Sequence, residues 1–590
     1  MSAPNVNTHW GSVIAEELAE AGVSAVCVAP GSRSTPLTVA FHEHPDVRIF
    51  SHLDERSAAY FALGRARRTG EPTPLVCTSG TAAANFHPAV IEASNARVPM
   101  LLLTADRPPE LQDSGANQTV DQEALYGDAV RWYRTLPEPR VEARRLRSLR
   151  TTLARAVGES TNPPAGPVHL NCPFAKPLEP TDVPGDVPER FAAEHPRAAS
   201  GRDGPYVSLH RGRRTLDSGA LAGVLEAVAA ADRGLIVVGP ADAPTPARDD
   251  LAALASATRF PVLADPLSGV RFGPHVAETV TCGGYDSYLD ARITDAWPDP
   301  DVVLRFGASP TSKTLREYLN RADARQFLVD PADGWREATF AATDRIEADP
   351  SWLAGTLADG LEGEENAGAD HAWVDRFRAV ERAYWDLLGD VDLPREGGVL
   401  AAVAANAPDP ATMFVSNSMP VRDLDRFGKP GTADLRVLGN RGASGIDGIT
   451  STALGAGSAT DDPLLLVTGD LAYYHDMNGL LALGRCDVDA TIVEINNDGG
   501  GIFHMLPIEA FDPFESQFKT PHGLDFTPTA DLYDLAFRRE DSIEGAEAAL
   551  ADALDSEGSH VIEVTSDAES NHRRREELQE RVVAELEGTP

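Results

Sequence analysis

Short apolar runs alternate with amphipathic stretches along most of the 590 residues. Runs rich in β-branched and aliphatic residues predict strands, and apolar positions spaced by three or four residues predict helices. The first series has predicted strands at 25–29, 47–53, 75–78, 100–104 and 168–171, separated by predicted helices such as 57–68 and 82–96. Because strands that alternate with helices in this way form parallel sheets, this series predicts an α/β domain.

Two further series of the same kind follow, and each predicts another α/β domain. The second has predicted strands at 235–238, 262–264, 302–306 and 327–329, and the third at 413–415, 436–438, 464–467, 491–495 and 561–564. We therefore predict an α/β fold of three consecutive doubly wound, mainly parallel-sheet domains at residues 1–183, 205–350 and 370–590. The stretches at 173–205 and 349–370 are predicted linkers, and the Arg- and Glu-rich stretch from His572 is a predicted solvated helix.

Acidic residues dominate the charge of the chain. The formal net charge is −38, spread along the whole length, and lysine occurs only at Lys176, Lys313, Lys429 and Lys519. Such a lysine-poor, acidic composition is similar to that of proteins from salt-accumulating halophiles, where molar salt shortens the Debye length to about 3 Å and screens self-repulsion. Nucleic acid is not an expected partner for this surface.

Cysteine spacing and hydropathy indicate in which cellular environment the protein is expected. The five cysteines lie far apart, mostly inside apolar runs, without the spacing of a zinc site, so buried reduced thiols are expected. No apolar run reaches membrane-spanning length, and the start of the chain has no signal-peptide pattern. We therefore expect a cytoplasmic protein that does not insert into membranes.

Two predicted strands of the third series each end on oxygen-bearing residues. The run at 464–468 leads into Gly-Asp-Leu at 469–471, and the run at 490–495 leads into Asn-Asn-Asp-Gly-Gly-Gly at 496–501. Ligands bind at the carboxyl ends of strands in open α/β sheets, and Asp470, Asn497 and the Gly499 carbonyl are hard oxygen ligands suited to Mg²⁺, with Mn²⁺ possible. Taken alone, the same residues also fit an ordinary turn of a βαβ unit.

The loops that follow the predicted strands carry a series of motifs that occurs in the same order in one enzyme family. These are PGSRSTPL at 30–37, HLDER at 52–56, TSGTA at 78–82, TADRPPEL at 104–111, GANQ at 115–118, NCPF at 171–174, SNSM at 416–419, GNRGASGIDG at 439–448, GDL at 469–471 and NNDGGGIF at 496–503. With them the chain closely resembles the 2-succinyl-5-enolpyruvyl-6-hydroxy-3-cyclohexene-1-carboxylate (SEPHCHC) synthases, thiamine-diphosphate (ThDP) transferases of menaquinone biosynthesis. The resemblance covers the first and third domains almost wholly and the middle domain thinly.

The resemblance implies a two-substrate reaction. It is ThDP- and Mg²⁺-dependent decarboxylation of 2-oxoglutarate, followed by 1,4-addition of the resulting succinyl-semialdehyde carbanion to isochorismate with release of CO₂. The first domain would bind the pyrimidine ring and the third the diphosphate. In this superfamily the two come from different subunits, which implies a homodimer or a dimer of dimers.

Two other functions stay open at this point. One is another ThDP-dependent 2-oxoacid decarboxylase or carboligase. The four arginines in or next to the motifs, Arg33, Arg107, Arg422 and Arg441, argue against this alternative, because a pyruvate site does not need so much positive charge. The other is a catalytically silent ligand-binding relative, which would not need to keep both Glu55 and the Asp470–Asn497 pair.

The resemblance also implies roles for single residues. Glu55 matches the catalytic glutamate that bonds the aminopyrimidine ring, and Ile446 matches the bulky residue that holds the cofactor bent. The expected cofactor-binding residues are Glu55, Ser418, Ile446, Gly469, Asp470, Leu471 and Asn497, and the expected metal ligands are Asp470, Asn497 and Gly499. The expected substrate-binding residues are Ser32, Arg33, Arg107, Gln118, Lys313, Arg422, Arg441, Ile502, Phe503 and Leu506.

Each assignment has a plainer alternative. A single glutamate in the first turn of a helix is usually a surface charge, and a surface arginine is often ion-paired or solvated. Ile446 and the apolar residues 502, 503 and 506 fit core packing as well. The contacts of these side chains in the folded chain separate the alternatives.

Overall fold

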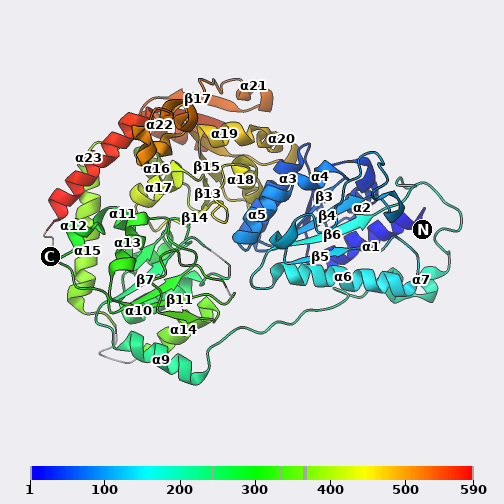
Figure 1. The fold of residues 1–590 in the computed structure, drawn as a ribbon, viewed down its shortest axis with the longest axis horizontal. Helices are drawn as coiled ribbons and strands as arrows, with labels where there is room; N and C mark the ends of the chain where they lie inside the picture. The colour runs from blue at the N-terminus through cyan, green and yellow to red at the C-terminus, as the bar shows by residue number, and fades with distance from the viewer. Residues whose placement is uncertain (1–2, 242, 333, 363–367, 588–590) are drawn as a thin grey trace. The chain divides into compact units, whose positions relative to one another are not determined.

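The computed structural model describes residues 3–587 except 242, 333 and 363–367. The chain divides into two compact units, one of residues 1–211, 440–461 and 475–489 and the other of residues 212–439, 462–474 and 490–590. The described residues form three six-stranded sheets in which every strand pair is parallel (Figure 1). The α/β fold with three sheets is therefore confirmed, and the predicted domain boundaries remain predictions.

The first sheet lies in the first unit and has the strand order β2-β1-β3-β4-β6-β5. Its strands are β1 (Ala25–Val28), β2 (Arg48–Ser51), β3 (Thr73–Cys77), β4 (Met100–Asp106), β5 (Trp132–Thr135) and β6 (Pro167–Pro173). Its helices are α1 (Val6–Glu20), α2 (Thr35–Glu43), α3 (Glu55–Thr69), α4 (Thr81–Ala84), α5 (His87–Asn95) and α6 (Ala143–Thr161), and the short helices α7 (Phe191–Glu194) and α8 (Pro196–Ala199) follow. The apolar strand runs and the inner faces of α1, α2 and α6 form one core.

The third sheet has the same strand order as the first, β14-β13-β15-β16-β18-β17. Its strands are β13 (Ala411–Val415), β14 (Leu435–Leu438), β15 (Leu464–Gly469), β16 (Thr491–Asn496), β17 (Ala536–Glu540) and β18 (His560–Thr565). Helices of this series are α15 (His371–Gly389), α16 (Arg395–Ala405), α17 (Met419–Phe427), α18 (Ile449–Gly457), α19 (Asp470–Asp476), α20 (Ala482–Cys486), α21 (Thr529–Tyr533), α22 (Ile543–Leu554) and α23 (Ala568–Leu586). Of these, α18 and α20 belong to the first compact unit.

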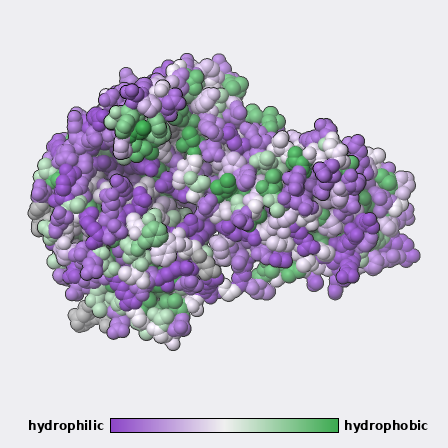
Figure 2. All heavy atoms as spheres, viewed as in Figure 1, coloured by the Kyte–Doolittle hydropathy of each residue, from purple (hydrophilic) through white to green (hydrophobic). Residues whose placement is uncertain are grey.

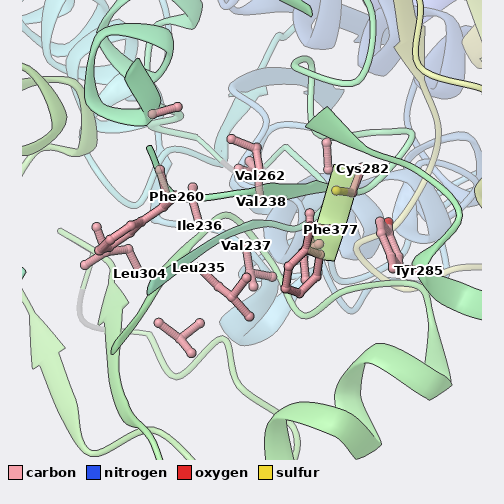
Figure 3. Close-up of a cluster of buried hydrophobic side chains, with 14 of the residues drawn as sticks. Leu235, Ile236, Val237, Val238, Phe260, Val262, Cys282, Tyr285, Leu304 and Phe377 are labelled. Carbon is pink, nitrogen blue, oxygen red and sulfur yellow. The ribbon is translucent and has the colours of Figure 1, made fainter. Parts of the chain in front are cut away.

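The middle sheet has the order β9-β8-β7-β10-β11-β12, the doubly wound order of dinucleotide-binding folds. Its strands are β7 (Gly234–Val238), β8 (Val262–Ala264), β9 (Thr281–Cys282), β10 (Val302–Phe306), β11 (Arg325–Val329) and β12 (Asp344–Ile346). Its helices are α9 (Ser218–Ala229), α10 (Arg248–Thr258), α11 (Tyr285–Tyr288), α12 (Ala291–Thr294), α13 (Lys313–Arg321) and α14 (Pro350–Leu361). Figure 3 shows part of its core, with strand residues such as Leu235 and Ile236 and with Phe377 from α15.

Two predictions about the connecting segments are wrong. The stretch at 349–370 is largely the helix α14, which buries Leu353 and Leu357 in the core of the middle sheet, and residues 363–367 lie outside the described residues. The C-terminal helix α23 is not simply solvated, because Leu578 and Val582 pack into the same core. In both segments a few apolar positions at helical spacing outweigh the surrounding charge.

The structure also bears on the predictions about the cysteines, about membrane-spanning helices and about the surface. All five cysteines are buried free thiols. Within the described residues, no helix combines the length and the apolar character needed to cross a membrane. The face seen in Figure 2 is mostly hydrophilic, with scattered apolar side chains.

Candidate active site

The predicted metal ligands lie at the carboxyl edge of the third sheet. β15 and β16 are adjacent and buried, with Gly469 opposite Ile495, so Asp470 and Asn497 follow neighbouring strand ends. Asp470 is 3% exposed. Its Oδ1 accepts the Leu471 amide at 2.6 Å and its Oδ2 accepts the Gly499 amide at 2.9 Å. Burial raises the pKa of Asp470, and the two amides act in the opposite direction.

Asn497 has a side-chain oxygen that accepts no hydrogen bond from the described residues. Its Nδ2 donates to Glu396 Oε1 at 2.9 Å, whereas its Oδ1 is buried and has no hydrogen-bond partner among the described residues. A buried acceptor without a donor is costly unless a ligand completes it. A hard cation beside Asp470 would do so, and the donor set of one carboxylate, one amide oxygen and one backbone carbonyl suits Mg²⁺.

No cluster of three or more His, Cys, Asp or Glu side chains suited to a metal occurs among the described residues. A metal at Asp470 would therefore draw on amide and backbone oxygens as well. Asp498, the acidic neighbour of Asn497, does not join this set. It is exposed, and its Oδ1 accepts the amides of His522 and Gly523 at 2.9 and 2.7 Å.

The glycine run after Asn497 is held in a conformation that other residues would not adopt. Gly499 has φ +136°, and a Cβ there would lie 2.1 Å from the carbonyl oxygen of Lys519. The Gly500 amide donates to the same carbonyl at 2.7 Å. The segment at 519–523 thus packs on the glycine run, and it brings His522 Nε2 within 3.2 Å of Asp470 Oδ2. His522 is a site neighbour that no motif indicated.

Two more predicted residues lie where β13 leads into α17, in the same sheet. Ser418 is the residue before the helix and has φ +72°. Arg422, one turn later, donates from Nη1 to the Ser418 carbonyl at 2.6 Å. β13 pairs with β15, so this turn and Asp470 leave adjacent strands at the same edge of the sheet.

The predicted apolar wall follows the glycine run as the short 3₁₀ helix η6 (Gly501–Met505). Phe503 packs its ring edge-on against Phe518, with centroids 5.5 Å apart, and Ile502 is half-buried. Leu506 is 47% exposed. Core packing therefore explains Phe503 in part, but it does not explain Leu506.

Lys313 stands apart from the other predicted residues. It is the first residue of α13 in the middle-sheet series, its side chain is 80% exposed, and it pairs with Glu317 one turn along at 3.4 Å. Among the described residues, no interaction joins Lys313 to another predicted site residue. Its role in substrate binding stays a prediction.

The predicted anion-binding residues of the first unit follow β1 and β4, two strands of the first sheet with β3 between them. Arg33 is buried, its amide donates to Thr78 Oγ1 at 3.2 Å, and its Nη1 donates to the Phe174 carbonyl at 2.6 Å. Arg107 donates from Nη2 to the Asn117 carbonyl at 2.7 Å. Burial lowers the pKa of Arg33, and the nearby charge of Arg107 acts in the same direction.

Both arginines have a side-chain N–H donor that makes no hydrogen bond to the described residues. The Nε atoms of Arg33 and Arg107 are buried, and neither has a hydrogen-bond partner within the described part of the chain. Gln118 lies beside them on the loop after Asn117, where its Nε2 donates to the Ser79 carbonyl at 3.1 Å. Ser32 is exposed at the start of the same region. The cluster has the charge and the free donors to bind a carboxylate.

Glu55 is the first residue of α3 and is half-buried. Asp54 caps this helix by accepting the amides of Arg56 and Ser57, so Glu55 is fixed at the N-terminal turn. One turn later, Tyr60 donates its hydroxyl to Asp447 Oδ2 at 2.5 Å. The helix that begins at Glu55 is thus tied to the loop that carries Ile446.

Glycines allow α3 and α18 to cross closely within the first unit. A Cβ on Gly64 would lie 1.9 Å from the Thr452 carbonyl oxygen, and one on Gly455 would lie 2.0 Å from that of Phe61. Ile446, just before α18, is half-buried and is not among the fully buried hydrophobic residues of the described chain.

The loop that carries Arg441 and Ile446 has a buried anchor that no motif indicated. Glu92 on α5 accepts the amides of Gly442, Ala443 and Ser444 at 2.8, 2.6 and 3.3 Å. Arg67 pairs with the same carboxylate at 3.1 Å. Glu92 lies about 350 residues from this loop, so only the fold could have revealed the contact.

Two family profiles match the chain. The N-terminal TPP binding domain of thiamine pyrophosphate enzymes matches residues 8–125, and the C-terminal TPP binding domain matches residues 434–564. The first match includes Glu55 and the Arg33–Arg107 cluster. The second includes Arg441, Ile446, Asp470, Asn497 and Gly499.

Three relatives that align with almost the whole chain are all named SEPHCHC synthase. A SEPHCHC synthase of Haloarcula marismortui is 62% identical over 596 residues, covering 100% of both chains, and that of Natronomonas pharaonis is 61% identical over 594 residues, covering 99% of this chain and 100% of the relative. Both organisms are halophiles, in agreement with the acidic composition. A SEPHCHC synthase of Chloroflexus aurantiacus is 46% identical over 571 residues, covering 96% and 94%. The chain belongs to the family of 2-succinyl-5-enolpyruvyl-6-hydroxy-3-cyclohexene-1-carboxylate synthases.

Proposed function

We propose that this chain forms SEPHCHC from 2-oxoglutarate and isochorismate with release of CO₂, as a step of menaquinone biosynthesis, with ThDP and Mg²⁺ or Mn²⁺ as cofactors. The observation that carries the proposal is the buried, unpartnered Oδ1 of Asn497 beside Asp470, inside a matched TPP binding domain. A metal held there would anchor the diphosphate of ThDP. When bound, ThDP supplies the electron sink that decarboxylation of a 2-oxoacid requires.

We assign metal binding, proton exchange and support of the cofactor to different residues of the chain. Asp470, Asn497 and the Gly499 carbonyl would hold the metal, and Glu55 would exchange a proton with the aminopyrimidine ring. Ile446, which is half-buried, would support the bent cofactor. The Asp54 cap holds the backbone of the first helical turn, from which Glu55 projects.

Both substrates are anions, and the chain offers positive charge for them. Arg33 and Arg107 have unused buried Nε donors, and arginine pairs with carboxylates through a planar fork. We assign isochorismate to this pair together with Ser32, Gln118 and Lys313, and the 2-oxoglutarate unit to Arg422, Arg441 and Ser418. Ile502, Phe503 and Leu506 would supply an apolar wall.

Oligomeric assembly is part of the proposal. Homodimers or dimers of dimers are expected because ThDP must contact both TPP binding domains, which this enzyme class contributes from different subunits. Light scattering coupled to size exclusion in molar KCl measures the subunit number directly. A strictly monomeric, active enzyme would contradict this part alone.

The test is a coupled assay in molar KCl with ThDP, Mg²⁺ and both substrates, following CO₂ release and isochorismate loss together. Equal consumption of the two substrates is expected, and Glu55→Gln should abolish or greatly slow it. Release of CO₂ with isochorismate untouched would instead identify a 2-oxoglutarate decarboxylase. Folded, ThDP-loaded protein without turnover would favour a ligand-binding relative.

A further inference from the structure

Glu396 contacts the side-chain amide of Asn497 at the end opposite to the unpartnered Oδ1. It is on the first turn of α16, is 2% exposed, and accepts Asn497 Nδ2 at 2.9 Å with its Oε1. Ser566, just after β18, donates its hydroxyl to the same oxygen at 2.7 Å. The Glu396 amide donates to Asn571 Oδ1 at 3.1 Å, so the backbone that carries this carboxylate is itself held in place.

An asparagine amide has two ends of opposite hydrogen-bonding character. Nδ2 only donates and Oδ1 only accepts, so rotation by half a turn would offer a metal two hydrogens in place of an oxygen. A carboxylate accepts only, and it therefore attracts the NH₂ end and repels the carbonyl end. With Glu396 on one side, Asn497 has one stable orientation, in which Oδ1 is the free atom.

We propose that Glu396 is a positioning residue, which holds Asn497 Oδ1 toward the metal that anchors the diphosphate. This rests on the proposed function, because that function supplies the metal. Glu396 itself touches neither substrate nor metal, and acts through Asn497. Partners of this kind typically change metal affinity by about 10- to 100-fold when they are removed.

The direct test measures metal binding rather than turnover. Binding of Mn²⁺ in the presence of ThDP is followed by the electron paramagnetic resonance signal of free Mn²⁺, in molar KCl. Glu396→Leu should weaken Mn²⁺ binding by about 10- to 100-fold. Ser566→Ala is the matched control, since it removes the other donor to Glu396 Oε1 and leaves the Asn497 contact, and it should change the affinity by less than about 3-fold.

A second arm separates orientation of the amide from simple attraction between Glu396 and the cation. Both ends of a carboxylate are oxygens, so in the Asn497→Asp background no orienting partner is needed. Glu396→Leu should then not weaken Mn²⁺ binding, because a carboxylate at 497 offers an oxygen in either orientation and no longer faces a like charge. An equal loss in both backgrounds would show that Glu396 acts by charge alone, and would overturn the proposal.

Folding is checked by circular dichroism and thermal unfolding of every variant. If Glu396→Leu does not fold, Glu396→Gln takes its place, because a glutamine pairs with the Asn497 amide in either orientation. It should weaken Mn²⁺ binding several-fold with Asn497 present and not in the Asn497→Asp background. Folded Glu396→Leu, or Glu396→Gln in its place, that binds Mn²⁺ as tightly as wild type overturns the inference but not the proposed function. Wild-type protein that binds neither Mn²⁺ nor ThDP overturns both.

Discussion

The first and third sheets share one strand order and carry opposite chemistry on it. In each sheet the order of the six strands is second, first, third, fourth, sixth, fifth along the series. The loop after the fourth strand carries Arg107 in the first sheet and Asn497 in the third. The loop after the first strand carries Arg33 in the first sheet and Ser418 in the third. Equivalent loops leave the same edge of each sheet, so topology decides where functional residues lie and not what they do.

The unpartnered atoms show the difference most clearly. Among the predicted site residues, the edge of the first sheet has two buried donors without a partner in the described part of the chain, Nε of Arg33 and Nε of Arg107, whereas the edge of the third has one such acceptor, Oδ1 of Asn497. Unused donors suit an anion and an unused acceptor suits a cation. In the proposed function, the same architecture would therefore bind carboxylates at one edge and a metal at the other.

The largest effect should come from the only carboxylate among the proposed metal ligands. Asp470→Asn removes its charge, and we expect Mn²⁺ and ThDP binding to weaken by about 100-fold or more, because a hard cation depends on anionic oxygen. Calorimetric titration in molar KCl measures this. The matched control is Asp498→Asn, an exposed neighbour that faces the amides of His522 and Gly523, and it should change the affinity by less than about 3-fold. Equal losses would place the metal elsewhere.

On the first sheet, Arg33→Gln should act on the substrate and not on the metal. We expect the KM for isochorismate to rise by about 100-fold while ThDP affinity stays within about 3-fold, since the loss is a charged pair with a carboxylate. Arg155→Gln, an exposed arginine on α6 that pairs with Glu159, is the control and should leave both constants unchanged. A loss of cofactor affinity in Arg33→Gln would break the division between the two edges.

The glycine run tests how far the third-sheet edge depends on backbone shape. Gly499→Ala places a Cβ 2.1 Å from the Lys519 carbonyl at φ +136°. We expect a loss of about 3 kcal/mol in the free energy of unfolding, or a displaced loop with weakened metal binding. Gly484→Ala in α20 has nothing within 4 Å of the added carbon and should be neutral or slightly stabilising. Unfolding in urea compares the two variants.

The buried carboxyl group of Asp476 should have a smaller effect, on how the free energy of unfolding depends on pH. Asp476 accepts the amide and the hydroxyl of Ser451 at 2.7 and 3.1 Å, and burial raises its pKa to about 6. An acid whose pKa is raised on folding favours the folded state at low pH, and that contribution is lost as pH rises from about 4 through about 6. The accumulated change is at most about 3 kcal/mol.

The check is urea unfolding of wild type and Asp476→Asn in molar KCl between pH 4 and 7. The variant should lose less stability than wild type over this range, because its amide does not titrate. Glu71→Gln, at an exposed position of the first unit, should keep the wild-type slope. Parallel curves for wild type and Asp476→Asn would show that the Asp476 carboxyl is not the titrating group.

The interior strands and the motif loops could be predicted from sequence, and four of the six edge strands of the described sheets could not. The strands β5, β9, β12 and β17 were missed, and each lies at the edge of a sheet. An edge strand has one neighbour and is often half-exposed, so it does not need a continuous apolar run. The Arg-Arg-Glu of β17 shows this, since most of that strand faces solvent.

Sequence alone determined the three α/β series and the acidic character, and its motifs predicted the metal ligands Asp470 and Asn497 and the catalytic residue Glu55, because periodicity and short motifs are local properties of the chain. Only the tertiary structure revealed the partners that act on these residues. Glu396 lies 101 positions from Asn497, and Glu92 lies about 350 from the loop that it holds. A lone glutamate on a helix carries no local sign of its distant partner. Which buried oxygen or nitrogen is left unused depends on every contact around it, and those contacts exist only in the folded chain.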